Sequence, residues 1–405
     1  MSEPTGTRHA TDRGGDDPAA IAGALAGRLA EGAGDRDAER RLPYAEVAGI
    51  AADGLLGISV PTAHGGPGAG PATVAEVLRL IGTADLSIAQ VLQPHFAFLN
   101  ALRLRGGPAA RQRLYSDVLK GTLVANAQAE RGGAHSHDQQ ARLERAASGG
   151  WTLTGTKFYA TGSLFAGWLA VTAKADVPGE AEPQTHIAFV PREAPGLHVE
   201  DDWNGMGQRT TGSGTVRLDR VEVADELVLP HYLTFREPTT YGAYAQLLHS
   251  AIDVGLARGA LTEAARFVRT TSRPWSESGA TEASADPLTV QRFGELEVQV
   301  RAAEALLSTA AGRVADADAG PTDASTAEAS ISVAAAKVAG GAAAVDVAGA
   351  LFEVAGTRSA GEDLNLHRFW RDARTHTLHD PARWKVQHIG RYSLNGQRPP
   401  RHGQI

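Results

Sequence analysis

WTLTGTKFY, residues 151–159, is the stretch that decides the fold of this 405-residue chain. After the Gly149-Gly150 pair its residues alternate between apolar and polar types, which is typical of a half-buried β-strand that follows a turn. Comparable short runs separated by glycine and proline lie at residues 123–129, 168–174, 185–190 and 215–223. Five or more such strands predict an antiparallel β domain over about residues 121–232.

Helical patterns flank this β segment on both sides. From Pro18 to about Leu119, small and apolar residues recur at helical spacing. Beyond Tyr241 long helical patterns return, and the last of them is so rich in alanine, glycine and valine that close packing in a bundle is expected. These later helices are predicted at residues 244–272, 287–314 and 327–355, with surface loops at 274–286 and 315–326.

The sequence therefore predicts an α+β fold in three parts behind a short leader. We expect an N-terminal α domain, a central antiparallel β domain and a C-terminal four-helix bundle. The predicted boundaries are a disordered leader at 1–17, the helical domain at 18–120, the β domain at 121–232 and the bundle at 233–405.

Composition narrows the possible functions. The net charge is −7 and no lysine/arginine stripe is present, so neither nucleic acid nor an anionic membrane is an expected partner. The chain has no cysteine, which excludes disulfides, thiolate catalysis and cysteine-ligated metals, so redox chemistry must come from a bound organic cofactor. We see no apolar run of membrane-spanning length and no apolar signal core, which predicts a cytoplasmic protein.

The richest cluster of chemically active side chains is LHRFWRDARTHTLHDP, residues 366–381. On a helix His376 and His379 would share a face, and Pro381 is expected to end that helix. Imidazole titrates near neutral pH, so a histidine beside Asp380 is a candidate acid or base. The structural alternative remains open: packed histidines beside an ion-pair brace formed by Arg371, Asp372 and Arg374.

No metal site is predicted. His376, His379 and a neighbouring aspartate lack a fourth ligand, and the His135/His137 pair is expected to lie in a solvated loop. On local sequence alone, His95 in a long apolar helix is more typical of a satisfied core residue than of a catalyst.

Five local motifs, in the right order, resemble the acyl-CoA dehydrogenase superfamily over about residues 40–395. They are GISVP with HGG (57–61, 64–66), AQAERGG (127–133) followed by Asp138, GTKFYATG (155–162), GMGQR with DRVEV (205–209, 219–223), and RDAR (371–374). The resemblance implies the three-domain fold of that superfamily, with a flavin held against the β domain.

One departure from the dehydrogenases bears on the chemistry. In the short- and medium-chain dehydrogenases, a glutamate six residues after the RDAR motif removes the α-proton of the substrate. That position is Asp380 here, which is one methylene shorter and lies beside His379. The run 370–381, with RWK at 383–385 and Asn395-Gly396, is more similar to the reduced-flavin-dependent monooxygenases, typified by dibenzothiophene and sulfone monooxygenases, with the amino-sugar nitrososynthases as cousins.

This closer resemblance implies a two-component system. A separate reductase supplies reduced flavin, O2 adds at flavin C4a, and the resulting (hydro)peroxyflavin oxygenates a small organic substrate such as a sulfur compound, an amine or a natural-product intermediate. The bundle packing of the family implies a homotetramer. Two alternatives stay open: an FAD-containing dehydrogenase that oxidises a thioester, and a non-catalytic flavin-fold binding module.

The resemblance also implies the cofactor and the site residues. Dehydrogenases hold the adenine half of FAD with an Arg-x-x-Phe-Gly segment, whereas RTTSRPW at 269–275 lacks Phe-Gly, so FMN is expected rather than FAD. Arg273, contributed by a neighbouring subunit, would bind the FMN phosphate. The flavin ring is expected to lie near Asn126, Gln128, Tyr159 and Thr161. His379 is expected to handle the peroxide proton, with His376 as its alternative and His95 as a second donor. Trp203 and Phe96 would wall the substrate pocket.

Overall fold

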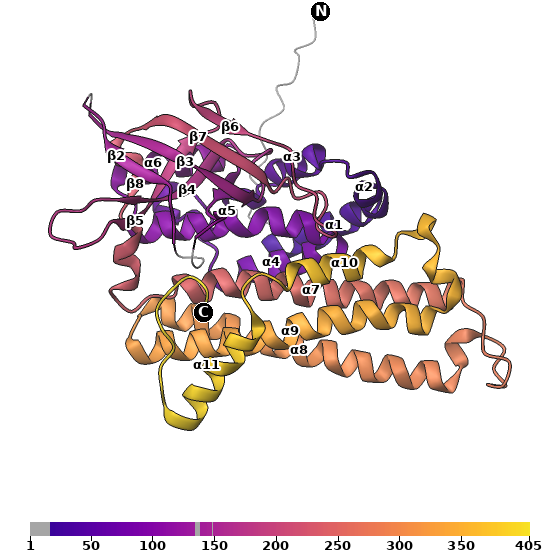
Figure 1. Ribbon diagram of the computed structural model, residues 1–405. Coiled ribbons are helices and arrows are strands. Elements are labelled where there is room, and N and C mark those ends of the chain that lie inside the picture. The colour runs from indigo at the N-terminus through magenta and orange to yellow at the C-terminus, as the bar shows by residue number, and fades with distance from the viewer. Residues whose placement is uncertain (1–16, 134–137, 148) are drawn as a thin grey trace, which may run out of the picture.

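The computed structural model describes residues 17–133, 138–147 and 149–405. The predicted leader, apart from Asp17, and the His135/His137 pair lie outside these described residues. Figure 1 shows the β domain on one side of the molecule and the long C-terminal helices on the other, with the helices of the N-terminal part between and beside them.

Between residues 17 and 119 the N-terminal part contains six α-helices. They are α1 (Pro18–Ala30), α2 (Ala33–Glu39), α3 (Tyr44–Ala52), α4 (Pro71–Ala84), α5 (Leu86–Arg105) and α6 (Pro108–Leu119). Every residue of α5 from Leu86 to Leu102 is buried, because this helix packs against β1 on one side and α7 on another. Its first turn is capped by Asp85, whose side chain accepts a hydrogen bond from the Ile88 amide at 3.1 Å.

The β domain contains the predicted strands and joins them in one sheet. The strands are β1 (Val124–Ala127), β2 (Arg142–Arg145), β3 (Trp151–Ala160), β4 (Trp168–Ala175), β5 (Gln184–Pro191), β6 (Leu197–Val199), β7 (Gly214–Val223) and β8 (Val228–Leu229). The order is β6-β7-β3-β2-β4-β5-β8, with β1 paired to β4. The stretch at 151–159 lies within β3, between β2 and β7.

The sheet is mixed, whereas the sequence predicted an antiparallel one. Most neighbours are antiparallel, but β1 and β2 each run parallel to β4. Along the sequence, the β2–β3 hairpin comes between β1 and β4. The chain therefore enters β4 running in the same direction as in β1. Gly150 in that hairpin has φ +77°, and a Cβ there would lie 2.8 Å from the Val223 carbonyl oxygen, so the turn requires glycine.

The C-terminal part is formed by long helices. They are α7 (Tyr241–Thr270), α8 (Pro287–Ala319), α9 (Asp323–Ala355), α10 (His367–His376) and α11 (Ala382–Asn395). The predicted loop at 315–326 is wrong, because alanine-rich α8 continues to Ala319 and α9 already begins at Asp323. A capping box starts α9, in which the Ser325 amide donates to Thr322 Oγ1 and the Thr322 amide donates to Ser325 Oγ.

Among the described residues, α9 is the one helix long and apolar enough to cross a membrane by length and composition. The sequence prediction that no such run exists is therefore wrong. In the structure α9 packs along α7 and α8, where Val333, Ala344 and Leu351 are buried, so its apolar character serves the bundle core.

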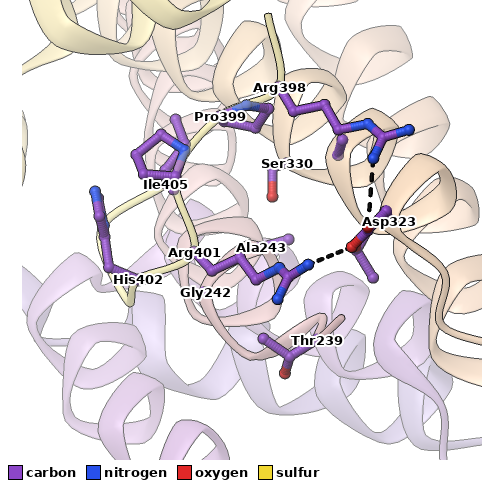
Figure 2. A pocket seen from close by; sticks show the side chains of 13 residues that line it. Thr239, Gly242, Ala243, Asp323, Ser330, Arg398, Pro399, Arg401, His402 and Ile405 are labelled. Carbon is purple, nitrogen blue, oxygen red and sulfur yellow. Dashed lines mark hydrogen bonds and ion pairs between the residues drawn. The ribbon is translucent and has the colours of Figure 1, made fainter. Parts of the chain in front are cut away.

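The C-terminal tail from Arg398 onward lies along the N-terminal ends of α7 and α9 (Figure 2). Arg398 and Arg401 both pair with Asp323. The contact is close enough that a Cβ on Gly242 would lie 2.2 Å from the His402 carbonyl oxygen. The small cleft beside this tail contains none of the predicted site residues.

Candidate active site

A cavity of about 520 Å³ lies where the β domain meets the turn after α10. Four residues predicted from the sequence line it: Tyr159 and Thr161 at the end of β3, Trp203 in the segment before β7, and His379 after α10. Gln90 reaches the same cavity from α5. The structure thus brings together side chains from three parts of the chain.

Aromatic rings and a guanidinium group form one wall of the cavity. Tyr159 has φ +55°, an uncommon conformation for a non-glycine residue, and its side chain is 47% exposed. Its ring meets Trp203 edge-on at 6.1 Å, and the Arg131 guanidinium lies 5.1 Å from the same ring. Trp203 is fixed in turn, because its indole Nε1 donates to the Gln208 carbonyl oxygen at 2.8 Å.

A chain of buried hydroxyl groups forms another part of the lining. Thr161 Oγ1 lies 2.9 Å from Ser213 Oγ, which lies 2.7 Å from Thr211 Oγ1. Thr211 then donates to the Gln208 carbonyl oxygen at 3.0 Å. Gln208 belongs to a motif recognised in the sequence, whereas Thr211 and Ser213 were not predicted, although the hydroxyl-rich run TTGS at 210–213 was a visible signal.

Two buried polar atoms of the lining have no partner in the described part of the chain. They are the Gln208 side-chain amide nitrogen and the Thr375 hydroxyl. On neighbouring β1, the Asn126 side-chain oxygen is also buried without a partner. Unsatisfied buried groups are costly, so these atoms fit a polar molecule that completes their hydrogen bonds when it binds. The edge of a flavin ring carries both donors and acceptors and meets this requirement.

The two predicted histidines lie close together, but not on one helix. Helix α10 ends at His376, His379 lies in the following turn, and Pro381 caps the start of α11 rather than ending α10. The ring centroids of His376 and His379 are 5.2 Å apart. His379 Nδ1 donates to the His376 carbonyl oxygen at 2.9 Å, so its Nε2 carries the lone pair.

His376 lies at the centre of a buried polar cluster beside the cavity. Its Nδ1 lies 2.5 Å from Asp253 Oδ1, and its Nε2 lies 3.1 Å from both His249 Nδ1 and Gln90 Oε1. His249 and Asp253, which are four residues apart in α7, were not predicted from the sequence. Their presence in an otherwise apolar stretch was the available signal, but nothing local to it points to residue 376.

Burial sets the charges of this cluster. It lowers the pKa of His379 to about 4, assisted by the charge of His376, and it lowers the pKa of His249 well below its usual value. Burial also opposes ionisation of Asp253, but His376 and Lys337 outweigh it and hold the pKa of that carboxyl below its ordinary value. At neutral pH the cluster therefore contains neutral His249 and His379 rings and an ionised Asp253.

The three imidazoles have the composition of a metal site. His249, His376 and His379 each offer a ring nitrogen, and these nitrogens lie within 4.8 Å of one another. The Nδ1 atoms of His376 and His379 are occupied by Asp253 and a carbonyl oxygen. Hydrogen bonds within the protein are thus sufficient to explain the geometry of the cluster.

Four predicted site residues lie elsewhere. His95 is fully buried, its Nε2 donates to the Leu56 carbonyl oxygen at 2.8 Å, and its Nδ1 accepts from the Val124 amide at 3.0 Å. Both ring nitrogens are thus engaged, so His95 cannot act as the second proton donor that was predicted. Burial also lowers the pKa of His95 to about 4. Phe96 is a core residue with no exposed surface and does not line the cavity, because this face of α5 turns into the N-terminal core. Gln128 is exposed next to β1, and Arg273 lies in the exposed segment after α7.

Arg371 and Asp372 tie α10 to the other domains. Arg371 pairs with Asp37 of α2 and donates to the Met206 carbonyl oxygen at 2.7 Å. Asp372 Oδ1 accepts from the Gln208 amide at 2.6 Å, which positions the segment that carries Gln208 and Trp203. The brace predicted as the structural alternative is present only in part. Arg371 is ion-paired, but to Asp37, and no ion pair joins Arg371, Asp372 and Arg374 to one another in the described part of the chain.

Asp372 is expected to make stability depend on pH. Burial, with the charge of Asp37, raises its pKa from 3.8 to about 7. The folded protein therefore holds this proton where the unfolded chain has lost it, so stability falls as pH rises from about 4 to about 7. The effect is at most about 4 kcal/mol.

We expect Asp372→Asn to reduce this loss of stability with rising pH, as measured by urea unfolding at several pH values. The variant should be more stable than the parent at pH 8 and similar to it at pH 4. Asp225→Asn, at an exposed ion pair with Arg145, should instead follow the parent curve. Identical slopes for Asp372→Asn and the parent would contradict the prediction.

Comparison with known proteins gives matches along nearly the whole chain. Acyl-CoA dehydrogenase N-terminal, middle and C-terminal domain families match residues 19–122, 127–221 and 247–384. Dibenzothiophene monooxygenase of Rhodococcus erythropolis is 30% identical over 96% of this chain and 95% of its own length. The "Probable FMNH2-dependent monooxygenase SfnC" of Pseudomonas putida is 32% identical over 94% of this chain and 95% of its own. The crystal structure of FMN-bound TdsC from Paenibacillus sp. A11-2 superposes with a TM-score of 0.91 at 30% identity and covers 96% of this chain and all of that one.

Proposed function

This chain belongs to the acyl-CoA dehydrogenase family, and from that premise we propose that it oxygenates a small organic substrate in the cavity between Tyr159, Trp203 and His379. Within the family it is a flavin-dependent monooxygenase that uses reduced FMN, as its likeness to dibenzothiophene monooxygenase, SfnC and FMN-bound TdsC over nearly the whole chain shows. When bound, reduced FMN supplies the two electrons that activate O2. One oxygen atom then goes to the substrate and the other leaves as water.

The observation that carries the proposal is the neutral histidine at the cavity. His379 presents an Nε2 lone pair, because its Nδ1 donates to a backbone carbonyl oxygen and because its pKa of about 4 keeps the ring neutral at pH 7. Such a ring can take a proton from a hydroxyl or amine group in the cavity and return it later. We therefore keep His379 as the proton-handling residue and give His376 the role of its buried support.

The lining residues would hold the cofactor and exclude water. Thr161, Gln208 and Thr375 offer a hydroxyl, an amide and a second hydroxyl for the polar edge of the flavin ring, and the last two have no other partner among the described residues. Tyr159 and Trp203 cover the opposite side with apolar surface, which limits water beside the reacting atoms. Asn126 and Gln128 remain proposed contacts on the β1 side.

The position of Asp380 argues against thioester dehydrogenation. This carboxylate stands where the dehydrogenases have their base, but it does not line the cavity. Its Oδ2 accepts a hydrogen bond from Gln246 Nε2 at 2.6 Å, and its backbone has φ +58°. The carboxylate is thus directed to α7 rather than to a bound substrate.

The family also suggests a location, an oligomeric state and a partner protein for the enzyme. We propose a cytoplasmic homotetramer that receives reduced FMN from a separate flavin reductase, which the FMNH2-dependent name of SfnC supports. The substrate classes to test first are those named for relatives: the aromatic sulfur compound dibenzothiophene, and an indole, with which TdsC was crystallised.

The function is tested by following labelled oxygen. Protein supplied with chemically reduced FMN, ¹⁸O2 and dibenzothiophene or indole should place one labelled atom in the product, and reduced FAD should be less effective. Co-purified FAD that bleaches with an acyl-CoA thioester would overturn the proposal in favour of a dehydrogenase. Failure to bind FMN or FAD would overturn it in favour of another ligand.

Arg273 gives a separate test of cofactor choice. If its guanidinium binds the terminal phosphate, Arg273→Ala should weaken FMN binding about tenfold or more and leave riboflavin, which lacks the phosphate, unaffected. Arg269→Ala is the matched control, since it removes an exposed arginine one turn earlier, in the last turn of α7. Fluorescence titration with both flavins measures the effect, and equal losses for the two flavins would remove Arg273 from the phosphate site.

A further inference from the structure

A buried acid and a buried base lie behind the histidine cluster, inside the bundle. The side chains of Asp253 on α7 and Lys337 on α9 are 1% and 4% exposed, and their charged atoms are 3.7 Å apart. In the described part of the chain, neither Asp253 Oδ2 nor Lys337 Nζ has a hydrogen-bond partner. Burying two charges with so few hydrogen bonds is costly, and well-packed apolar residues would serve stability at least as well. A role in the site explains why the pair is present.

The other oxygen of Asp253 connects this pair to the cavity. Oδ1 accepts from His376 Nδ1 at 2.5 Å, which fixes both the ring and its tautomer, as carboxylates do for histidines in hydrolase triads. His376 Nε2 then faces His249 Nδ1 and Gln90 Oε1, each at 3.1 Å. A neutral His376 ring can accept from His249, and a cationic ring can donate to Gln90.

The His376 ring therefore has a hydrogen-bond partner for Nε2 in both its neutral and its cationic state. The charged and titratable groups around it are Asp253 and His249 from α7, Lys337 from α9, His379 and Asp380 from the turn, and Lys385 from α11. Asp253 is the carboxylate that bonds the ring directly, whereas Asp380 is bonded to Gln246. The counter-charge for a protonated His376 thus comes from Asp253.

We propose that Asp253 is a positioning residue that orients His376 and balances its charge when the ring binds a proton, and that Lys337 keeps this carboxylate ionised and limits how tightly the proton is held. The step is the transfer of a proton from protonated His379 Nε2 to His376 Nε2 and back, between rings whose centroids are 5.2 Å apart; one N–H bond breaks as the other forms, and no electrons are gained or lost. The inference rests on the proposed function, because it assigns the store for the proton that His379 exchanges with the cavity.

Nuclear magnetic resonance of the histidine rings tests this without flavin. In the parent protein, ¹⁵N-labelled His376 should carry its proton on Nδ1, with the strongly deshielded signal of a short bond to a carboxylate, and acid should add a second proton at Nε2. Asp253→Asn should weaken that second protonation at least tenfold, and Lys337→Met should strengthen it. Opposite signs from two neighbouring substitutions are not expected from a merely structural effect.

Turnover supplies the functional readout. With reduced FMN, Asp253→Asn should lower kcat about 100-fold with KM changed less than about threefold, and Asp253→Glu should restore part of the loss. Ser250→Ala is the matched control, because Ser250 is equally buried on α7 but bonds only the Gln246 carbonyl oxygen among described residues. It should leave both kcat and the His376 signals unchanged.

The proposal fails if His376 carries its proton on Nε2 in the parent protein, or if Asp253→Asn and Lys337→Met shift its protonation in the same direction. Should Asp253→Asn not fold, the parent spectrum and Lys337→Met still decide. Absence of oxygenated product with the parent protein would sink the proposed function, while the ring measurements would still report on Asp253.

Discussion

Replacing His379 with alanine is expected to lower the rate of product formation by about 10²–10⁴-fold, which is the range for losing a general acid–base group. The reason lies in its position, since it is the histidine of the cluster that lines the cavity, and its Nε2 is unprotonated because Nδ1 donates to the His376 carbonyl oxygen. FMN affinity should change little, because the hydroxyl and amide groups of Thr161, Gln208 and Thr375 remain in place. Reduced FMN should still be oxidised, with O2 released as hydrogen peroxide instead of entering the product.

The matched control is His388→Ala, which removes a histidine of α11 that is not part of the cluster. Parallel assays of labelled product, peroxide and FMN binding distinguish the two variants. Product formation by His379→Ala at the parent rate would remove this residue from the mechanism. Equal loss of FMN binding and product formation would assign it a cofactor-binding role instead.

Gly207→Ala is expected to destabilise the protein by about 1–3 kcal/mol, and more if the neighbouring helix cannot move. A Cβ at this position would lie 2.1 Å from the Arg371 carbonyl oxygen and 2.3 Å from its carbon, both backbone atoms of α10. To relieve the clash, α10 must move away from the segment that carries Gln208. That movement would break the 2.6 Å hydrogen bond from the Gln208 amide to Asp372 and disturb Trp203, so FMN affinity should fall with stability.

Gly294→Ala makes the opposite prediction and is the control for this pair. Gly294 lies inside α8, and apart from the backbone of its own helix turn no described atom lies within 4 Å of where a Cβ would stand, so alanine should stabilise the protein by about 0.5–1 kcal/mol through helix propensity. Urea unfolding and FMN titration measure both variants. A Gly207→Ala protein as stable as its parent would show that α10 and the 203–209 segment are not held as closely as described.

Local pattern was enough to predict most of the architecture. The alternation at 151–159 becomes β3 because a two-residue period places one face of the strand on the core, and the alanine-rich helix at 327–355 lies within α9 because small side chains allow close helix packing. The motif resemblance predicted the fold, the flavin chemistry and FMN, which the comparisons with related proteins confirm. The parallel pairing of β4 was not predicted, because strand direction depends on partners far along the chain.

Prediction of the site was limited for the same reason, because residues far apart in the sequence form it. His376 and His379 were expected on one helical face, whereas they come together because the chain turns after α10. His249 and Asp253 complete the cluster from more than 120 residues earlier, and no local pattern reveals that contact. The residue type of His95 made it a candidate proton donor. Only the hydrogen bonds of its two buried ring nitrogens show that it joins α5 to Leu56 and Val124.

The burial of α5 from Leu86 to Leu102 has a consequence for how the cavity opens. A helix covered by the sheet on one side and the bundle on another cannot tilt or slide without disturbing both, so the wall that carries Gln90 is a rigid one. The opposite wall is formed by Tyr159, Trp203 and Arg131, of which the first and last are exposed. Substrate should therefore enter and product leave on the side of these three residues. The side-chain motions of Tyr159, Trp203 and Arg131 would then set how fast the product leaves.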